Sequence, residues 1–231
     1  MRTNEENNLK AIILSIPIIE CLINRIYRKW IKPFPGSMEY WNQRYKSGGD
    51  SGSGSYNELA TFKAEIVNHF VEEHNIETVI EYGCGDGNQL RLASYLCYVG
   101  FDVSEKALSL CTSIFSDDKT KIFKPMDKYE GETAQLTLSL DVIYHLVEDD
   151  VFKSYMERLF NSSEHFVIIY SSNTSDNRNN KLLHVKHRKF SEWVQIKQPH
   201  WNLMQHIPNR YPHNDHNQWS VSDFYIYEKV K

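Results

Sequence analysis

Residues 78–90 read Thr-Val-Ile-Glu-Tyr-Gly-Cys-Gly-Asp-Gly-Asn-Gln-Leu. An apolar, β-branched run leads into the acid Glu81, and three glycines then alternate with other residues. Glycine lets the backbone turn with positive φ and lets a ligand lie against bare main chain. A helix-compatible run follows from residue 89 to 96. The segment therefore predicts a strand, a tight turn and a helix, which is the first unit of a doubly wound α/β domain.

The glycine spacing bears on the kind of ligand. A dinucleotide fingerprint reads G-x-G-x-x-G, so that a pyrophosphate rests on the helix N-terminus. Here Gly83, Gly85 and Gly87 follow the pattern G-x-G-x-G, and Asp86 lies inside the turn. A carboxylate where a diphosphate would dock is electrostatically unfavourable. An NAD(P)-dependent oxidoreductase is therefore the less favoured alternative.

Three later segments, 98–104, 121–127 and 135–146, are further short apolar runs, each with an acid at or near its end. These acids are Asp102, Asp127 and Asp141. Ser104 is a candidate N-cap for a helix over 105–114. Ligands of open parallel sheets bind at the carboxyl ends of the strands, so the acids are expected there, together with Tyr144 and His145. Other expected elements are helices over 60–75 and 149–160 and strands over 165–171 and 223–229.

The composition narrows the class of protein. The chain has 231 residues, a length that fits one main domain. Its net charge of −4 argues against a protein that binds the phosphate backbone of nucleic acids. Its four cysteines include no C-x-x-C pair, so neither a disulfide framework nor a structural zinc site is indicated, and a reducing, cytoplasmic location is expected. Residues 213–216 have metal-ligand side chains but lie in a polar, Pro-flanked turn, and no metal is predicted.

Residues 1–37 are expected to form an N-terminal helical extension, and residues 38–231 the main domain. The apolar run at 11–24 is too short to span a bilayer, which needs about 20 apolar residues. It is interrupted by Pro17 and Glu20. The run is expected to pack on the domain or on a second subunit, with peripheral membrane contact as the alternative.

A Gly/Ser-rich segment at 47–55 follows the aromatic and basic residues Tyr40, Trp41, Arg44 and Tyr45. It can be interpreted as a flexible linker, but its aromatic flanks favour a mobile flap with anchored ends that folds over a ligand.

Several motifs together give the chain a family resemblance. They are Tyr-Trp-x-x-Arg-Tyr with the flap, the glycine turn, Ser-Leu-Asp-Val-Ile-Tyr-His-Leu-Val-Glu-Asp, His-Arg-Lys-Phe-Ser-Glu-Trp and the closing Asp-Phe-Tyr-Ile-Tyr. In this order they resemble class I S-adenosylmethionine (SAM) methyltransferases of bacterial capsule and surface-polysaccharide biosynthesis, including the O-methyl phosphoramidate type. The resemblance implies a Rossmann-like, mostly parallel, seven-stranded sheet and SAM as cofactor.

The resemblance also implies roles for single residues. Asp102 would accept hydrogen bonds from the ribose hydroxyls, the residue at position 127 would face the adenine, and Arg44 or Tyr45 would lie near the methionyl carboxylate. The full set of expected cofactor-binding residues is Tyr40, Arg44, Tyr45, Gly54, Glu81, Gly83, Cys84, Gly85, Asp102, Val103, Asp127 and Leu140.

The acceptor determines whether a base is needed. A sugar hydroxyl must lose its proton, and His145 is the candidate base, with Asp141 as a second candidate catalytic residue. A phosphate or phosphoramidate oxygen is already ionised and needs only positioning. The local excess of cations at 178–197 suggests an anionic, small-molecule or sugar-linked acceptor, bound by Tyr144, His187, Arg188 and Lys189. A small-molecule methyltransferase outside polysaccharide pathways and a non-catalytic SAM-binding partner are the alternatives.

Overall fold

The computed structural model describes residues 34–212 and 220–230. The chain divides into two compact units, and the larger of them, Gly36–Lys231, contains the whole sheet. Most of the expected extension at 1–37, its apolar run and residues 213–216 lie outside the described residues. No helix within the described part of the chain is long and apolar enough to cross a membrane.

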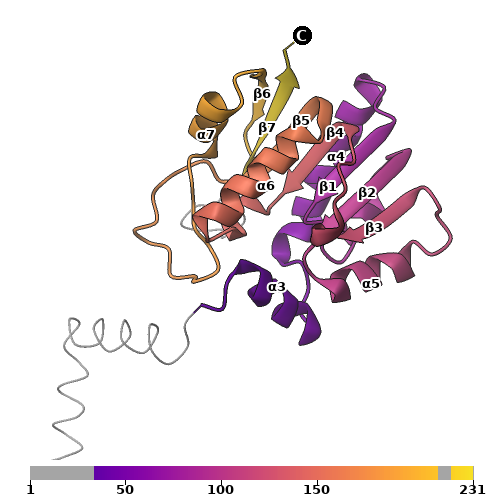
Figure 1. Ribbon diagram of the computed structural model, residues 1–231, viewed down its shortest axis with the longest axis horizontal. Coiled ribbons are helices and arrows are strands. Elements are labelled where there is room, and N and C mark those ends of the chain that lie inside the picture. Colours follow the sequence, from indigo (N-terminus) through magenta and orange to yellow (C-terminus); the bar gives the residue numbers. More distant parts are fainter. Residues whose placement is uncertain (1–33, 213–219, 231) are drawn as a thin grey trace, which may run out of the picture. The chain divides into compact units, whose positions relative to one another are not determined.

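The larger unit is built on a seven-stranded sheet with the order β3-β2-β1-β4-β5-β7-β6 (Figure 1). The strands are β1 (Thr78–Tyr82), β2 (Cys97–Asp102), β3 (Lys121–Pro125), β4 (Ala134–Leu140), β5 (Ser163–Ser171), β6 (Trp201–Ile207) and β7 (Asp223–Lys229). Neighbours from β3 through β5 pair in parallel, and β7 pairs antiparallel with both β5 and β6. This confirms the expected doubly wound, mostly parallel sheet.

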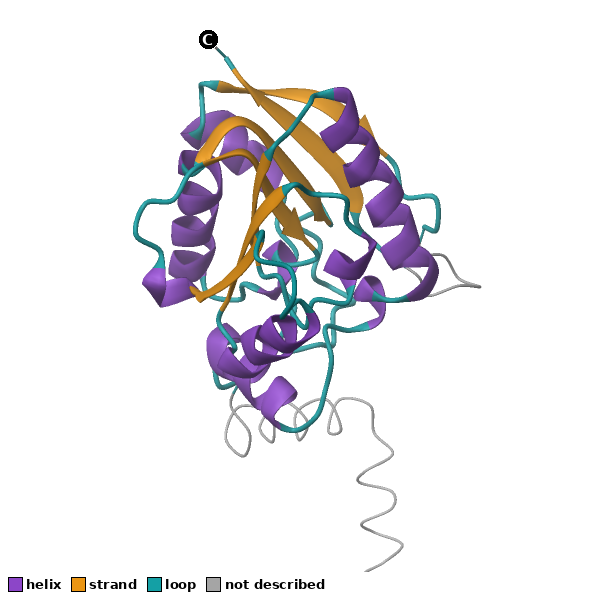
Figure 2. Cartoon of the chain, turned by 90° about the vertical axis from the view of Figure 1, so that its right-hand side faces the viewer, coloured by secondary structure: helices purple, strands orange, loops and turns teal. Residues whose placement is uncertain are grey.

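Helices cover both faces of the sheet (Figures 1 and 2). They are α4 (Asn57–Glu73), α5 (Glu105–Ile114), α6 (Asp149–Asn161) and α7 (Phe190–Lys197). A further helix, α3 (Ser37–Lys46), lies below the sheet in Figure 1. Side chains alternate across β1, so Val79 packs in the cluster that contains α4 and α5 residues, and Ile80 packs in the cluster that contains α6 and α7 residues. Strands buried on both faces in this way carry continuous apolar runs.

Two expected elements were wrong in extent. The helix predicted over 89–96 is only the 3-10 turn η2 (Gln89–Leu92), after which the chain is extended at Ala93. The strand predicted over 135–146 ends at Leu140, and His145 instead lies in the 3-10 turn η4 (Ile143–His145). By contrast, the helix over 105–114 and its cap are confirmed, because Ser104 Oγ accepts a hydrogen bond from the Ala107 N–H.

Candidate active site

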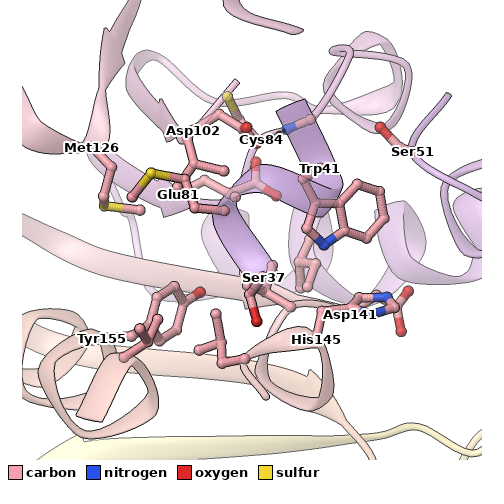
Figure 3. Close-up of a pocket in the computed structure, with 18 of the residues that line it drawn as sticks. Ser37, Trp41, Ser51, Glu81, Cys84, Asp102, Met126, Asp141, His145 and Tyr155 are labelled. Carbon is pink, nitrogen blue, oxygen red and sulfur yellow. Dashed lines mark hydrogen bonds between the residues drawn. The ribbon is translucent and has the colours of Figure 1, made fainter. Parts of the chain in front are cut away.

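A cavity of about 420 Å³ lies at the carboxyl ends of β1, β2 and β4 (Figure 3). Its size falls in the range of small-molecule and cofactor sites. The glycine turn, the end of β2 and η4 contribute to its lining, together with residues of α3, α4 and α6. Of the expected site residues, those that line it are Tyr45, Glu81, Gly83, Cys84, Gly85, Asp102, Val103, Leu140, Asp141 and His145.

The glycines of the turn allow close contact between protein segments. Gly83, Gly85 and Gly87 all have positive φ, of 83°, 60° and 79°. A Cβ on Gly83 would lie 2.5 Å from Val142 Cγ2, and one on Gly85 would collide with Ser51 Oγ. The side-chain directions at these two positions therefore point at protein atoms, while the backbone of both residues lines the cavity.

Asp102 at the end of β2 is positioned by the turn itself. Its Oδ2 accepts from the Gly85 N–H at 2.9 Å, and its Oδ1 accepts from the Ser104 N–H at 2.8 Å. The side chain is buried, and burial raises the pKa of Asp102 above its ordinary value. The two hydrogen bonds lower this pKa, but their effect is smaller. Each carboxylate oxygen keeps a lone pair, so Asp102 can accept two more hydrogen bonds from a ligand in the cavity.

Asp127, which was expected to face the adenine, does not lie at the cavity. Asp127 is in the 3-10 turn η3 (Met126–Lys128), is exposed and does not line the cavity. Its neighbour Met126 lines the cavity instead, close to Asp102 in Figure 3.

Glu81 is a buried acid in the cavity lining. It accepts a hydrogen bond of 2.6 Å from the Tyr98 hydroxyl. Burial raises the pKa of Glu81 to about 7, although the Tyr98 bond and the charge of Lys63 act in the opposite direction. Glu81 therefore changes charge near neutral pH.

Sequence analysis missed Lys63, a buried cation in the same cavity. It lies on α4 with 1% exposure, and its Nζ is 2.8 Å from Asp141 Oδ2. Asp141 Oδ1 accepts two further bonds, both of 3.0 Å, from the Tyr144 and Ser222 hydroxyls. The available signal was a lysine on the apolar face of an amphipathic helix, in step with Leu59. Asp141 is thus the acid that neutralises Lys63.

Gln89 was also missed. Its Nε2 donates to the Ala60 carbonyl at 3.0 Å, while its buried Oε1 has no hydrogen-bond donor among the described residues. An unpaired buried acceptor is costly. Since Gln89 lines the cavity, a ligand with an N–H group could satisfy it.

His145 is held in a defined tautomer. Its Nδ1 lies 3.0 Å from the His184 carbonyl oxygen, which can only accept, so Nδ1 carries the proton and Nε2 is free as an acceptor. Burial lowers the pKa of His145 to about 4, so the imidazole is neutral at physiological pH. Trp41 and the imidazole pack in a T-shaped arrangement with ring centroids 4.8 Å apart, and Trp41 also lines the cavity.

The expected flap is bound to the glycine turn. Ser51 N–H donates to Asp86 Oδ2 at 2.9 Å, and the Asp86 N–H donates back to Ser51 Oγ at 3.0 Å. The Tyr56 hydroxyl also donates to Asp86. Asp86 therefore anchors the flap. The sequence placed this acid in the glycine turn but did not predict that role. Tyr45 is buried, and its hydroxyl lies 2.8 Å from Ser51 Oγ.

Three other residues expected at the cofactor lie just outside the cavity lining. Arg44 donates to the Asp50 carbonyl and carboxylate, at 2.6 and 2.8 Å. Tyr40 stacks on His184 with ring centroids 4.3 Å apart. Gly54 lies against Asp141, since a Cβ there would come within 2.7 Å of Oδ2.

The residues expected to bind an acceptor do not line the cavity. Arg188 donates to the Leu146 and Val147 carbonyls and pairs with Asp149 at 2.8 Å. The other three contacts are Lys189 with Glu192 at 2.8 Å, His187 Nδ1 with Ser172 Oγ at 2.7 Å, and Tyr144 with Asp141. The contacts of Arg188 connect loop 172–189 to residues 146–149.

Solved structures share this architecture. No protein-family model matches the chain, and no curated protein matches its sequence. The N-methyltransferase NodS from Bradyrhizobium japonicum, in complex with S-adenosylhomocysteine (SAH), matches with a TM-score of 0.65 at 10% identity, over 85% of this chain and all of its own. The chain has the class I methyltransferase fold.

Two further neighbours have the same fold. The magnesium protoporphyrin IX methyltransferase ChlM from Synechocystis, with bound SAH, has a TM-score of 0.63 at 14% identity, over 84% of this chain and 98% of its own. The methyltransferase domain of bacterial CtHen1 has a TM-score of 0.57 at 18% identity, over 73% of this chain and 97% of its own. At such identities the likeness concerns the fold alone, because one fold can carry many functions.

Proposed function

We propose that the protein is a SAM-dependent methyltransferase that methylates a hydroxyl oxygen placed beside His145. One observation carries the proposal. On a class I methyltransferase fold, the cavity at the carboxyl edge holds the buried Asp102, bound to the Gly85 N–H and free to accept more hydrogen bonds. Two neighbours of this fold are described with bound SAH.

The cavity lining offers a partner for each part of SAM. Asp102 would hold the ribose, and Val103 and Met126 would flank the adenine. Lys63 would pair with the α-carboxylate, while Gln89 Oε1 and Glu81 would accept from the α-ammonium. When bound, SAM supplies a methyl group activated by a sulfonium. The Lys63 assignment replaces Arg44 as the cation for the carboxylate, because Lys63 lines the cavity and Arg44 does not.

His145 would act as the general base. Its Nδ1–H is fixed on the His184 carbonyl, so Nε2 is the atom that can take a proton from an acceptor hydroxyl. A low pKa weakens a base, but it also keeps the imidazole unprotonated at neutral pH. Walls of Trp41 and Leu146 help to keep water away from this end of the cavity.

The identity of the acceptor rests on the sequence resemblance alone. It favours a sugar of a bacterial surface polysaccharide, with a phosphoramidate or other phosphorylated precursor, which would need no base, as the alternative. The neighbours do not choose among acceptors, since the name of one specifies a porphyrin and the name of another only an N-methyltransferase. Cytoplasmic location and contact with a membrane or a second subunit through residues 1–37 stay predictions.

Release of SAH tests the proposal. The protein is incubated with SAM and a panel of hydroxyl compounds, and we expect SAH to form together with a methylated acceptor. Binding of SAM without any release of SAH would support the alternative of a non-catalytic SAM-binding partner.

SAM affinity should rise with pH across neutrality. The pKa of Glu81 is raised to about 7, so its carboxyl group is mostly neutral at about pH 6 and mostly ionised at about pH 7.5. If only the ionised form holds the α-ammonium, affinity increases by up to about eightfold over this interval. Calorimetric titrations at both pH values measure the change. Glu81→Gln is the control, because it retains the ligand's own titration, and an equal rise in this variant would contradict the role of Glu81.

A further inference from the structure

The charged residues that line the cavity indicate what charge the acceptor can carry. Its charged lining residues are four acids and two cations: Glu81, Asp102, Asp141, Asp150, Lys63 and Arg158. Lys63 is paired with Asp141 at 2.8 Å. Arg158 donates to the Met126 carbonyl at 3.0 Å and lies over the Tyr129 ring, and Met126 is across the cavity from His145 in Figure 3. In the proposed complex Lys63 is also taken by the α-carboxylate of SAM. Arg44, whose guanidinium lies 5.6 Å from the Trp41 ring centroid, is paired with Asp50 at 2.8 Å. Neither cation is therefore free to bind an anionic acceptor near His145.

The basic segment at 178–197 does not supply one either. Four of its six cations are paired with acids at 2.6–2.8 Å, and none of the six lines the cavity. The pairs are Arg178 with Asp176, Lys186 with Asp149, Arg188 with Asp149, and Lys189 with Glu192. An anionic acceptor would find no free side-chain cation in the cavity lining near His145 and would be balanced only by the sulfonium of SAM, which is unfavourable at a partly desolvated site.

Apolar side chains also line the cavity. Trp41 packs against His145, and Met38 from the same helix lines the cavity with 63% exposure. Val151, 45% exposed at the start of α6, lines it as well. Large exposed apolar side chains grouped at a cavity mark a surface that a ligand can cover.

We propose that the acceptor is an uncharged hydroxyl compound whose ring packs on Trp41 between Met38 and Val151. This inference rests on the proposed function and narrows it, because phosphoramidates and phosphorylated precursors are excluded and neutral sugars and phenols remain. In the reaction the hydroxyl oxygen bonds to the methyl carbon, the carbon–sulfur bond breaks with its electron pair going to sulfur, and the hydroxyl proton goes to Nε2 of His145.

Matched acceptors that differ only in charge test this proposal. The pairs are para-hydroxybenzamide with para-hydroxybenzoate, and methyl glucuronamide with methyl glucuronate. SAH release gives kcat/KM, and calorimetry gives the affinity of each compound for the SAH-bound protein. We expect the neutral member of a pair to be favoured by about tenfold or more, which corresponds to one unfavourable charge interaction.

Each other outcome has a defined meaning. Equal or better use of the anionic members would overturn the proposal. So would a failure of every neutral member to bind while SAH binds. Failure of SAH itself to bind would instead refute the proposed function.

Variants of Trp41 test the ring contact separately. Trp41→Ala should raise KM for the accepted ring compound by about tenfold, with SAH affinity nearly unchanged, and Trp41→Phe should recover most of the loss. Trp193, which packs on Phe152 and does not line the cavity, provides the control Trp193→Ala. A fall in SAH affinity as large as the rise in KM would place Trp41 on the cofactor and contradict the proposal.

Discussion

His145→Ala should lower turnover by about 10²-fold or more while SAM affinity stays nearly intact. Among the described residues, His145 is the one histidine that lines the cavity. The variant therefore removes the Nε2 atom that can accept the hydroxyl proton. Steady-state SAH release measures turnover, and calorimetry measures SAM affinity. An unchanged rate would remove His145 as the base and would favour an acceptor that is already ionised.

A matched histidine and the pH profile sharpen this test. His165 is exposed on β5 and away from the cavity lining, so His165→Ala should leave turnover unchanged. Because burial lowers the pKa of His145 to about 4, its ionisation should not appear in the rate between about pH 6 and about pH 8. A histidine-type step near pH 6.5 would contradict the buried, neutral imidazole.

Lys63→Met should destabilise the protein by about 3 kcal/mol and abolish tight SAM binding. The substitution keeps the apolar stem but removes the cation 2.8 Å from Asp141, which is 12% exposed and would then be an unpaired acid. Urea unfolding measures the free-energy change, and calorimetry measures the loss of affinity.

The double variant Lys63→Met/Asp141→Asn separates the two effects. Removing the charge of Asp141 should restore most of the stability, because the amide still accepts from Tyr144 and Ser222. SAM binding should stay weak, since the cation for the α-carboxylate is still missing. Wild-type stability in the single variant would contradict the structural role, and wild-type affinity in the double variant would contradict the cofactor role.

Features set by local sequence were predictable. The G-x-G-x-G turn, Asp102 two residues before the Ser104 cap, and the helix at 105–114 all depend on neighbours close in the chain. The helix expected over 89–96 failed because a distant residue competes for its backbone. Asn68 of α4 accepts from the Ser94 N–H at 3.0 Å and donates to the Leu92 carbonyl at 2.8 Å, which fixes the chain in an extended path there.

Features that depend on distant contacts could not be read in this way. Lys63 and Asp141 are 78 residues apart, and a lysine in a helix gives no indication of which acid it will meet. Trp41 reaches His145 only because α3 lies beside η4. The basic residues at 178–197 indicated an anionic ligand from charge alone, and the pairing of Lys186 and Arg188 with Asp149 could be seen only in the fold.

Calorimetric titration with SAM, SAH and NADH, applied to the wild-type protein, Asp102→Asn and the control Asp127→Asn, tests the cofactor site. We expect micromolar binding of SAM and SAH and none of NADH. We also expect a loss of about tenfold or more in Asp102→Asn, which weakens two ribose hydrogen bonds, and no change in Asp127→Asn, whose side chain is outside the cavity lining. Binding of NADH alone, or equal affinities in wild type and Asp102→Asn, would contradict a SAM site at Asp102.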